Sequence, residues 1–144
     1  MTRFSRLSHR LAPWILAVIA CGFAWNLFGL FQLSQSMQQT EQSGMMGGMS
    51  AEAARVYYSL PAWMDLAFAI GAGGGALGCL AMAARLRMAV PVLATSAAGY
   101  VMLFLGDWAY GLFALLPNQL VILLTVLAIA FGLLALAVRL RRIG

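Results

Sequence analysis

Two aspartates and a group of aromatic residues are the side chains in this sequence best suited to chemistry. Asp65 and Asp107 each lie close to one end of a long apolar segment. Carboxylates attract cations, and aromatic faces add cation–π attraction, so the set predicts an outward-facing cavity for a cationic or sugar-like small molecule. The candidate lining residues are Asp65, Asp107, Asn26, Trp63, Trp108 and Tyr110, with Tyr57, Tyr58, Gln32 and Asn118 nearby. The competing interpretation is a belt of Trp and Tyr beside hydrated carboxylates, as found at any membrane surface.

A methionine-rich segment offers a second kind of chemistry. Thioether sulfurs are soft ligands that select Cu(I). The methionines in question are Met37, Met45, Met46 and Met49, with Met64 nearby. No histidine or cysteine lies among them to complete a site, because the single histidine is His9 in the N-terminal arm. We therefore expect segment 34–50 to be a poorly ordered loop, with Cu(I) capture as a distant alternative.

The sequence carries no recognisable catalytic constellation. No base is placed near a nucleophile, and there is no Cys-x-x-Cys pair or glycine-rich phosphate loop after a strand. The nine basic residues are all arginine and stand at the ends of apolar segments instead of forming one basic face with exposed aromatics. We therefore expect a non-enzymatic protein without a bound cofactor or metal and without a nucleic-acid partner.

Composition defines the elements that must position these residues. Of the 144 residues, 63% are hydrophobic and 9% are charged, against about 45–50% and about 25% in soluble domains. Four segments reach the roughly 20 apolar residues that a spanning helix needs. They are 11–33, 61–84, 88–110 and 120–138. The prediction is an all-α, four-transmembrane-helix bundle forming one membrane domain over 1–144, with the bilayer as its solvent and an outer loop 34–60 holding a short interfacial helix at 51–60.

Charge asymmetry predicts the orientation of the chain. Arginines flank the first and fourth spans and fill the connection between the second and third, whereas Arg55 alone falls in the loop 34–60. All four acidic residues lie on or near the side of that loop. Because arginine-rich connections stay in the cytoplasm, both termini are predicted to be cytoplasmic.

Small residues on the first two spans predict close helix packing. The second span contains two pairs of glycines spaced by four, and the first span carries an asparagine amide between two glycines on one face. Glycines let backbones approach where lipid supplies no hydrophobic drive, and a buried amide needs a partner. The predicted packing residues are Gly71, Gly74, Gly75, Gly78, Gly22, Asn26 and Gly29. The seam fits contacts within the chain or a contact with a second membrane protein.

Several short motifs resemble a known family. They are Trp25-Asn26-x-x-Gly29, Tyr58 followed by Pro61-x-Trp63, and Phe68-Ala69-Ile70 leading to Gly74, Gly78 and Leu80. In order and spacing, over about residues 14–105, these are similar to small bacterial four-helix membrane proteins often labelled "sugar transporter". The resemblance implies a multi-pass protein of the bacterial inner membrane and assigns no site residue. The MMGGM loop and the all-arginine charge depart from the family pattern.

Two functional hypotheses follow. The first is an inner-membrane protein that acts through helix–helix contacts, as a homo-oligomer or as an accessory subunit of a membrane complex. The alternative is a carrier or binding protein for a sugar-like or cationic small molecule, built on the aspartates and nearby aromatics.

Overall fold

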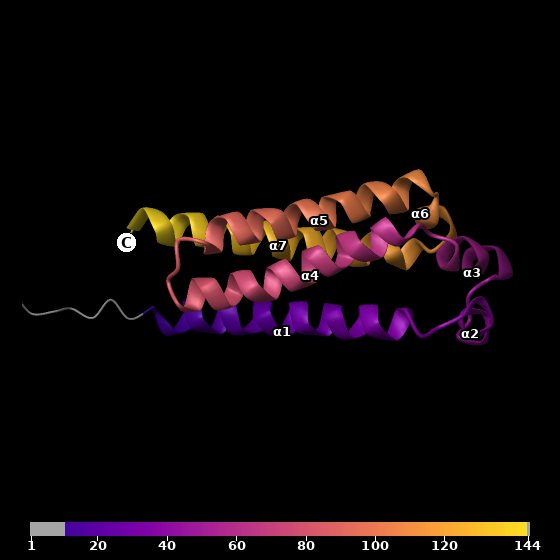
Figure 1. Ribbon diagram of the computed structural model, residues 1–144, viewed down its shortest axis with the longest axis horizontal. Coiled ribbons are helices and arrows are strands. Elements are labelled where there is room, and N and C mark those ends of the chain that lie inside the picture. The colour runs from indigo at the N-terminus through magenta and orange to yellow at the C-terminus, as the bar shows by residue number, and fades with distance from the viewer. Residues whose placement is uncertain (1–10, 144) are drawn as a thin grey trace, which may run out of the picture.

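The computed structural model describes residues 11–143 and is all-α within them. Four long helices run side by side, and three short helices connect them at one end (Figure 1). The long helices are α1 (Pro13–Ser36), α4 (Ala62–Ala83), α5 (Ala89–Ala109) and α7 (Pro117–Ile143). The short ones are α2 (Glu41–Met46), α3 (Ala51–Tyr58) and α6 (Leu112–Leu115). Positions 1–10, with His9 and the arginines predicted to hold the N-terminus in the cytoplasm, lie outside the described residues.

All four long helices have the length and apolar composition of membrane spans. The prediction of an all-α protein with four membrane-spanning helices is therefore confirmed. α1 and α7 expose most of their apolar surface, as helices at the periphery of a bundle in lipid do, whereas α4 and α5 are more buried. The protein is thus a multi-pass membrane protein whose interior forms chiefly around α4 and α5.

Glycines on α4 allow its close contacts with α1 and α5. A Cβ added at Gly71 would lie 2.8 Å from the Tyr100 ring, and one at Gly78 would lie 2.5 Å from Leu93. Gly74 faces Ser96 in the same way, and Gly75 faces the amide of Asn26 on α1. Where lipid gives no hydrophobic drive, such contacts hold helices together through van der Waals packing. At Gly71, Gly74, Gly75 and Gly78, the space beside α4 is therefore occupied by residues of the same chain, whereas Gly73 has no close neighbour.

Glycines on α1 complete this packing. A Cβ at Gly22 would lie 2.8 Å from Leu133 of α7 and 3.3 Å from Cys79 of α4. Gly29 lies opposite Ala72, with a corresponding distance of 3.4 Å. The predicted packing residues thus make contacts between helices of one chain. These glycines therefore do not favour a contact with a second protein.

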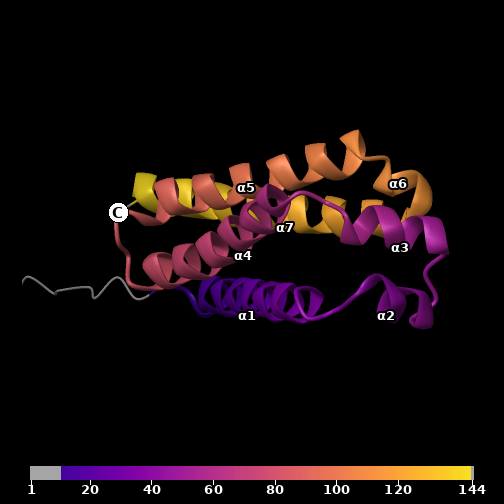
Figure 2. The same cartoon turned by 45° about the vertical axis from the view of Figure 1, so that its right-hand side comes forward.

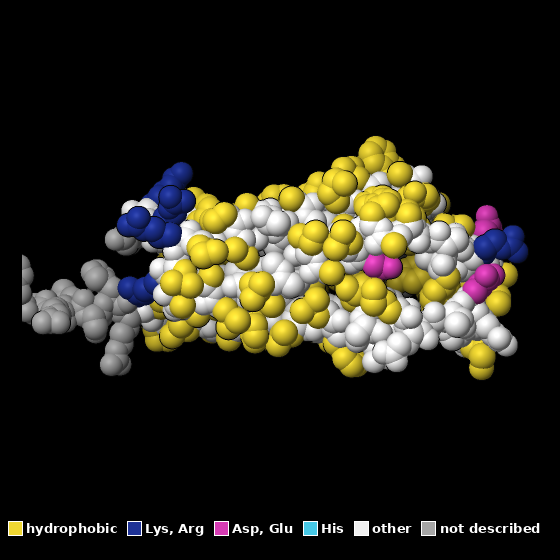
Figure 3. Space-filling model, viewed as in Figure 1, with side chains coloured by type: hydrophobic (Ala, Val, Ile, Leu, Met, Phe, Trp, Pro, Cys, Tyr) yellow, Lys and Arg dark blue, Asp and Glu magenta, His cyan; other side chains and the backbone are white. Residues whose placement is uncertain are grey.

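The charged residues divide between the two ends of the bundle (Figure 3). One end, which we call the arginine end, carries the α4–α5 connection and the last turns of α7. The opposite end, which we call the acidic end, carries α2, α3 and α6, with Glu41, Glu52 and Arg55. This separation is the pattern on which the cytoplasmic placement of the termini rests. The cytoplasmic placement of the termini stays a prediction.

Segment 34–50 is more regular than its composition indicates. α1 continues to Ser36, and α2 follows with a capping box in which Thr40 and Ser43 exchange side-chain and backbone hydrogen bonds. A capping box satisfies two backbone donors at a helix N-terminus and so favours a short helix. The expectation of a poorly ordered loop was therefore wrong for this segment. A further short helix, α3, lies inside the range 51–60, where a helix was predicted.

α1 and α4 diverge toward the acidic end, and this divergence creates space for a site. The two helices touch from Gly22 to Gly29 and then separate as α4 runs toward α5 (Figures 1 and 2). Toward the arginine end the interior is closed by an apolar cluster that includes Ile19, Cys79 and Leu133. The helices are therefore closely packed at the arginine end, whereas space remains between them at the acidic end.

Candidate functional site: a polar cavity at the acidic end

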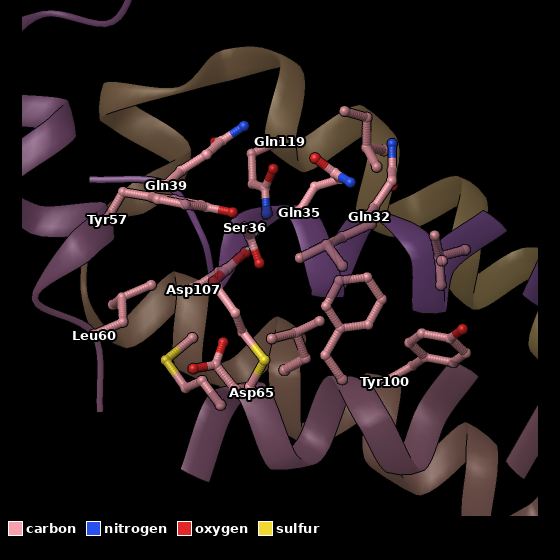
Figure 4. A pocket seen from close by; sticks show the side chains of 18 of the residues that line it. Gln32, Gln35, Ser36, Gln39, Tyr57, Leu60, Asp65, Tyr100, Asp107 and Gln119 are labelled. Carbon is pink, nitrogen blue, oxygen red and sulfur yellow. Dashed lines mark hydrogen bonds between the residues drawn. The ribbon is translucent and has the colours of Figure 1, made fainter. Parts of the chain in front are cut away.

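A cavity of about 820 Å³ occupies the space between the diverging helices. This volume lies within the 300–1,000 Å³ that small-molecule sites typically have. Its walls come from α1, α4, α5 and α7, and α3 contributes two tyrosines (Figure 4). The polar and ionisable lining residues are Gln32, Gln35, Ser36, Gln39, Tyr57, Tyr58, Asp65, Tyr100, Asp107 and Gln119. Asp65 and Asp107, predicted to share a cavity, thus line the same one.

Asp107 is the deepest charged group of the site. It lies in the last turn of α5 and is only 2% exposed. Gly106, its neighbour, lets α5 approach the side chains of Met64 and Trp63 on α4, which keeps this turn inside the bundle. Gln119 of α7 donates a hydrogen bond of 2.9 Å from Nε2 to Oδ2 of Asp107. A carboxylate this buried is costly unless hydrogen bonds or a positive charge compensate it, so Asp107 is well placed to hold a cation.

Asp65 and Tyr57 stand close to Asp107. Asp65 lies in the first turn of α4 and is exposed to the cavity mouth. The hydroxyl group of Tyr57 points into the cavity toward Asp107 and Gln119 (Figure 4). Burial raises the pKa of the Tyr57 phenol, and the charges of Tyr58, Asp107 and Asp65 raise it further. Tyr57 therefore stays protonated at neutral pH and can donate a hydrogen bond to a ligand or to a carboxylate.

The cavity also contains a set of amide groups that sequence reasoning largely missed. Gln32, Gln35 and Ser36 follow one another on a single face of α1. Tyr58 donates a hydrogen bond of 3.0 Å to Oε1 of Gln39, which connects α3 to the segment between α1 and α2. The regular spacing of polar residues in the last turns of an otherwise apolar span was the signal that could have revealed this face.

Asn26 is not among the residues that line the cavity. Its Nδ2 donates to the carbonyl of Gly22 at 2.7 Å, and its Oδ1 accepts from the Tyr100 hydroxyl at 2.9 Å. Tyr100 does line the cavity. Asn26 therefore positions a wall residue and does not itself reach a ligand, which corrects its predicted place in the lining.

Three predicted aromatic residues do not contribute to the cavity. Trp63, Trp108 and Tyr110 are 40%, 69% and 45% exposed and lie outside its lining. Successive residues of an α-helix point about 100° apart, so Trp108 turns away when its neighbour Asp107 points inward. The lining prediction was wrong for these residues, and also for Asn118. The aromatic walls are formed instead by Trp25, Phe28 and Phe68 together with the tyrosines.

The methionines of the Cu(I) hypothesis differ in burial, and two of them, Met37 and Met64, line the cavity. Met64 is 2% exposed in a core cluster with Leu103, whereas Met46 on α2 is 84% exposed. Within residues 11–143, no group of three or more His, Cys, Asp and Glu side chains is arranged to hold a metal ion. No observation therefore favours the Cu(I) hypothesis over the others.

Comparison with known proteins adds no assignment. No family model, curated protein or solved structure matches this chain. The fold and site define a class, a four-span membrane protein with a carboxylate-containing cavity between its helices. Any more specific function must be argued from that cavity.

The Asn26–Tyr100 hydrogen bond gives a first prediction. Tyr100→Phe removes the hydroxyl and leaves Oδ1 of Asn26 without its donor inside the bundle. Hydrogen bonds between membrane helices contribute about 0.6–2 kcal/mol, so a loss of that size in the free energy of unfolding is expected. Thermal unfolding in detergent measures it, with Tyr110→Phe, an exposed tyrosine, as the matched control. Equal melting temperatures for the two variants would contradict the assignment.

Proposed function

We propose that this protein binds a small, positively charged organic molecule in the cavity at the acidic end. The observation that carries the proposal is the meeting of Asp65 and Asp107 in one cavity, whose lining contains no arginine among residues 11–143. A bound cation would supply the positive partner that a buried carboxylate needs. Tyr57 and Tyr58, which line the same cavity, add aromatic surface for cation–π contact.

Binding is better supported than open conduction. The apolar cluster of Ile19, Cys79 and Leu133 closes the bundle between the cavity and the arginine end. A carrier function would require this cluster to separate, whereas a receptor or binding function uses the arrangement as it stands. Our proposal is therefore a binding protein, with transport as an added step that the same site could serve.

The proposed setting follows from charge and resemblance. The arginine end carries Arg85 and Arg87 in its connection and basic residues in the last turn of α7, which supports a cytoplasmic placement of that end. The cavity would then open on the outer side of the membrane. The resemblance to small bacterial membrane proteins supports the bacterial inner membrane, and the absence of a base–nucleophile pair in the sequence supports a non-enzymatic role.

A sugar-like ligand is the second candidate. Four glutamine side chains line the cavity, and amides hydrogen-bond the hydroxyl groups of a neutral molecule. The accessory-subunit hypothesis, by contrast, was motivated by glycines that contact helices of the same chain. No observation specific to it remains.

A ligand panel tests the proposal. A ligand that binds only the folded protein stabilises it by about 2.7 kcal/mol at a hundredfold excess over Kd. We expect tetramethylammonium to raise the melting temperature of the detergent-solubilised protein, compared with potassium at the same ionic strength. Glucose should produce no shift. A shift with glucose alone would favour the second candidate, and no shift with either would refute binding in this cavity.

A further inference from the structure

The cavity changes from polar to apolar along its length. On α1 the lining passes from Ser36 and Gln32 to Phe28 and Trp25, which lie deeper in the bundle. The other walls change in the same direction, except that Tyr100, whose hydroxyl is bonded to Asn26, lies beyond Leu103 on α5. The pairs are Asp65 to Phe68 on α4, Asp107 to Leu103 on α5, and Gln119 to Val126 on α7. A compact cation would contact the polar part and leave the apolar part unused.

Two side chains in the apolar part of the cavity are also partly exposed on the surface of α1, whereas the visible hollow lies at the polar part. A hollow beside an acidic side chain is visible in the flank of the molecule, where α1 and α4 separate (Figure 3). Trp25 and Phe28 are 38% and 52% exposed although they line the cavity. Both helices have the length and composition of membrane spans at this level. The exposed parts of Trp25 and Phe28 therefore belong to a helix that has the character of a membrane span.

We infer that the ligand is an amphiphilic cation, with its charged head at Asp65 and Asp107 and a single apolar chain along Trp25 and Phe28. This inference rests on the proposed function and specifies the class of its ligand. From Ser36 to Trp25 the α1 wall covers eleven helical steps, or about 17 Å at 1.5 Å per residue. That length accommodates a head group and part of an alkyl chain, and the rest of the chain would lie beside the partly exposed Trp25 and Phe28 in the membrane.

The orientation of such a molecule matches the membrane around it. Its head would lie at the level where α4 begins, with Tyr57 and the glutamines, and its chain would point toward the bilayer centre. A single-chain amphiphile in the outer leaflet already has this orientation, so it could enter from the side without turning over. A water-soluble cation would have no use for the exposed aromatic wall.

Fluorescence quenching tests the inference. Replacing Trp14, Trp63 and Trp108 by Phe leaves Trp25 as the one tryptophan of the four in the sequence. Titration with 12-bromododecyltrimethylammonium in uncharged maltoside micelles should quench Trp25 saturably. The sulfate with the same brominated chain partitions into micelles too, and should quench without saturation. Tetramethylammonium should displace the brominated cation only at concentrations at least tenfold higher.

A matched pair of variants tests where the alkyl chain of the bound cation lies. Phe28→Ala is expected to weaken binding of the brominated cation at least threefold, because Phe28 lines the cavity. Phe31→Ala, on the same helix at 57% exposure and outside the lining, should leave it unchanged. Equal affinities for tetramethylammonium and the brominated cation, or equal effects of the two variants, would refute the inference that the ligand is amphiphilic. Either result would still be consistent with cation binding in the cavity. Failure of both cations to bind would refute the proposed function itself.

Discussion

Asp107→Asn is expected to weaken cation binding ten- to hundredfold. The substitution keeps the shape of the side chain and an oxygen that can accept from Gln119, so the turn of α5 should remain in place. It removes a negative charge from a site that is only 2% exposed. Two charges 4 Å apart at an effective dielectric constant of about 20 interact by about 4 kcal/mol, and loss of about 1.4–2.8 kcal/mol of this corresponds to the expected change.

Asp65→Asn should have a smaller effect on the same affinity. Asp65 is exposed, so water screens its charge, and exposed charge pairs contribute about 0.2–1 kcal/mol. Glu52→Gln on α3 serves as the control, because Glu52 is an exposed acidic residue outside the cavity lining. Titration calorimetry with tetramethylammonium measures all three variants. An Asp107→Asn protein that binds as well as the Glu52→Gln protein would contradict the proposed role of the buried carboxylate.

Gly75→Val is expected to be the most destabilising single substitution on α4. A side chain at Gly75 would occupy the position of the Asn26 amide, so α1 must move or Asn26 must leave its hydrogen bonds to Gly22 and Tyr100. Overpacking a close contact costs about 1–3 kcal/mol, and the lost hydrogen bonds add to it. A total of about 2–4 kcal/mol in the free energy of unfolding follows from these contributions.

Gly73→Val is the matched control for this effect. Gly73 lies two residues away on the same helix, but nothing lies within 4 Å of a Cβ built there. The two variants therefore add the same side chain to the same apolar helix and differ in what that side chain meets. Reversible unfolding in mixed detergents compares them, and similar losses of stability would show that the α1–α4 contact is not as close as described.

The four membrane spans could be predicted from the sequence because membrane helices obey a simple physical requirement. Every backbone polar group in lipid must be satisfied within the helix, so long apolar segments predict helices directly. The same logic identified Asn26, since an amide in a span needs a partner. Its partner, Tyr100, lies 74 positions further along the chain, and no local pattern could identify it.

The cavity was harder to predict because it depends on how the helices cross. Asp65 and Asp107 share it, but their neighbours Trp63 and Trp108 do not, since rotation about each helix axis decides which residues face inward. α1 diverges from α4 where the close packing of its segment 22–29 against α4 ends. That point depends on both helices and cannot be identified from either one alone. The prediction from composition was also wrong for α2. There the Thr40–Ser43 capping box stabilises a short helix in a segment whose glycine- and methionine-rich composition indicated a poorly ordered loop.

Anomalous diffraction from crystals containing a bromine-labelled trimethylammonium compound would test cation binding in the cavity most directly. We expect one bromine peak per chain between α1 and α4, with the ammonium group beside Asp65 and Asp107. The peak should be absent from crystals of the Asp65→Asn/Asp107→Asn double variant. Peaks confined to the lipid-facing surface or the arginine end, or a cavity peak that persists in the double variant, would contradict this expectation.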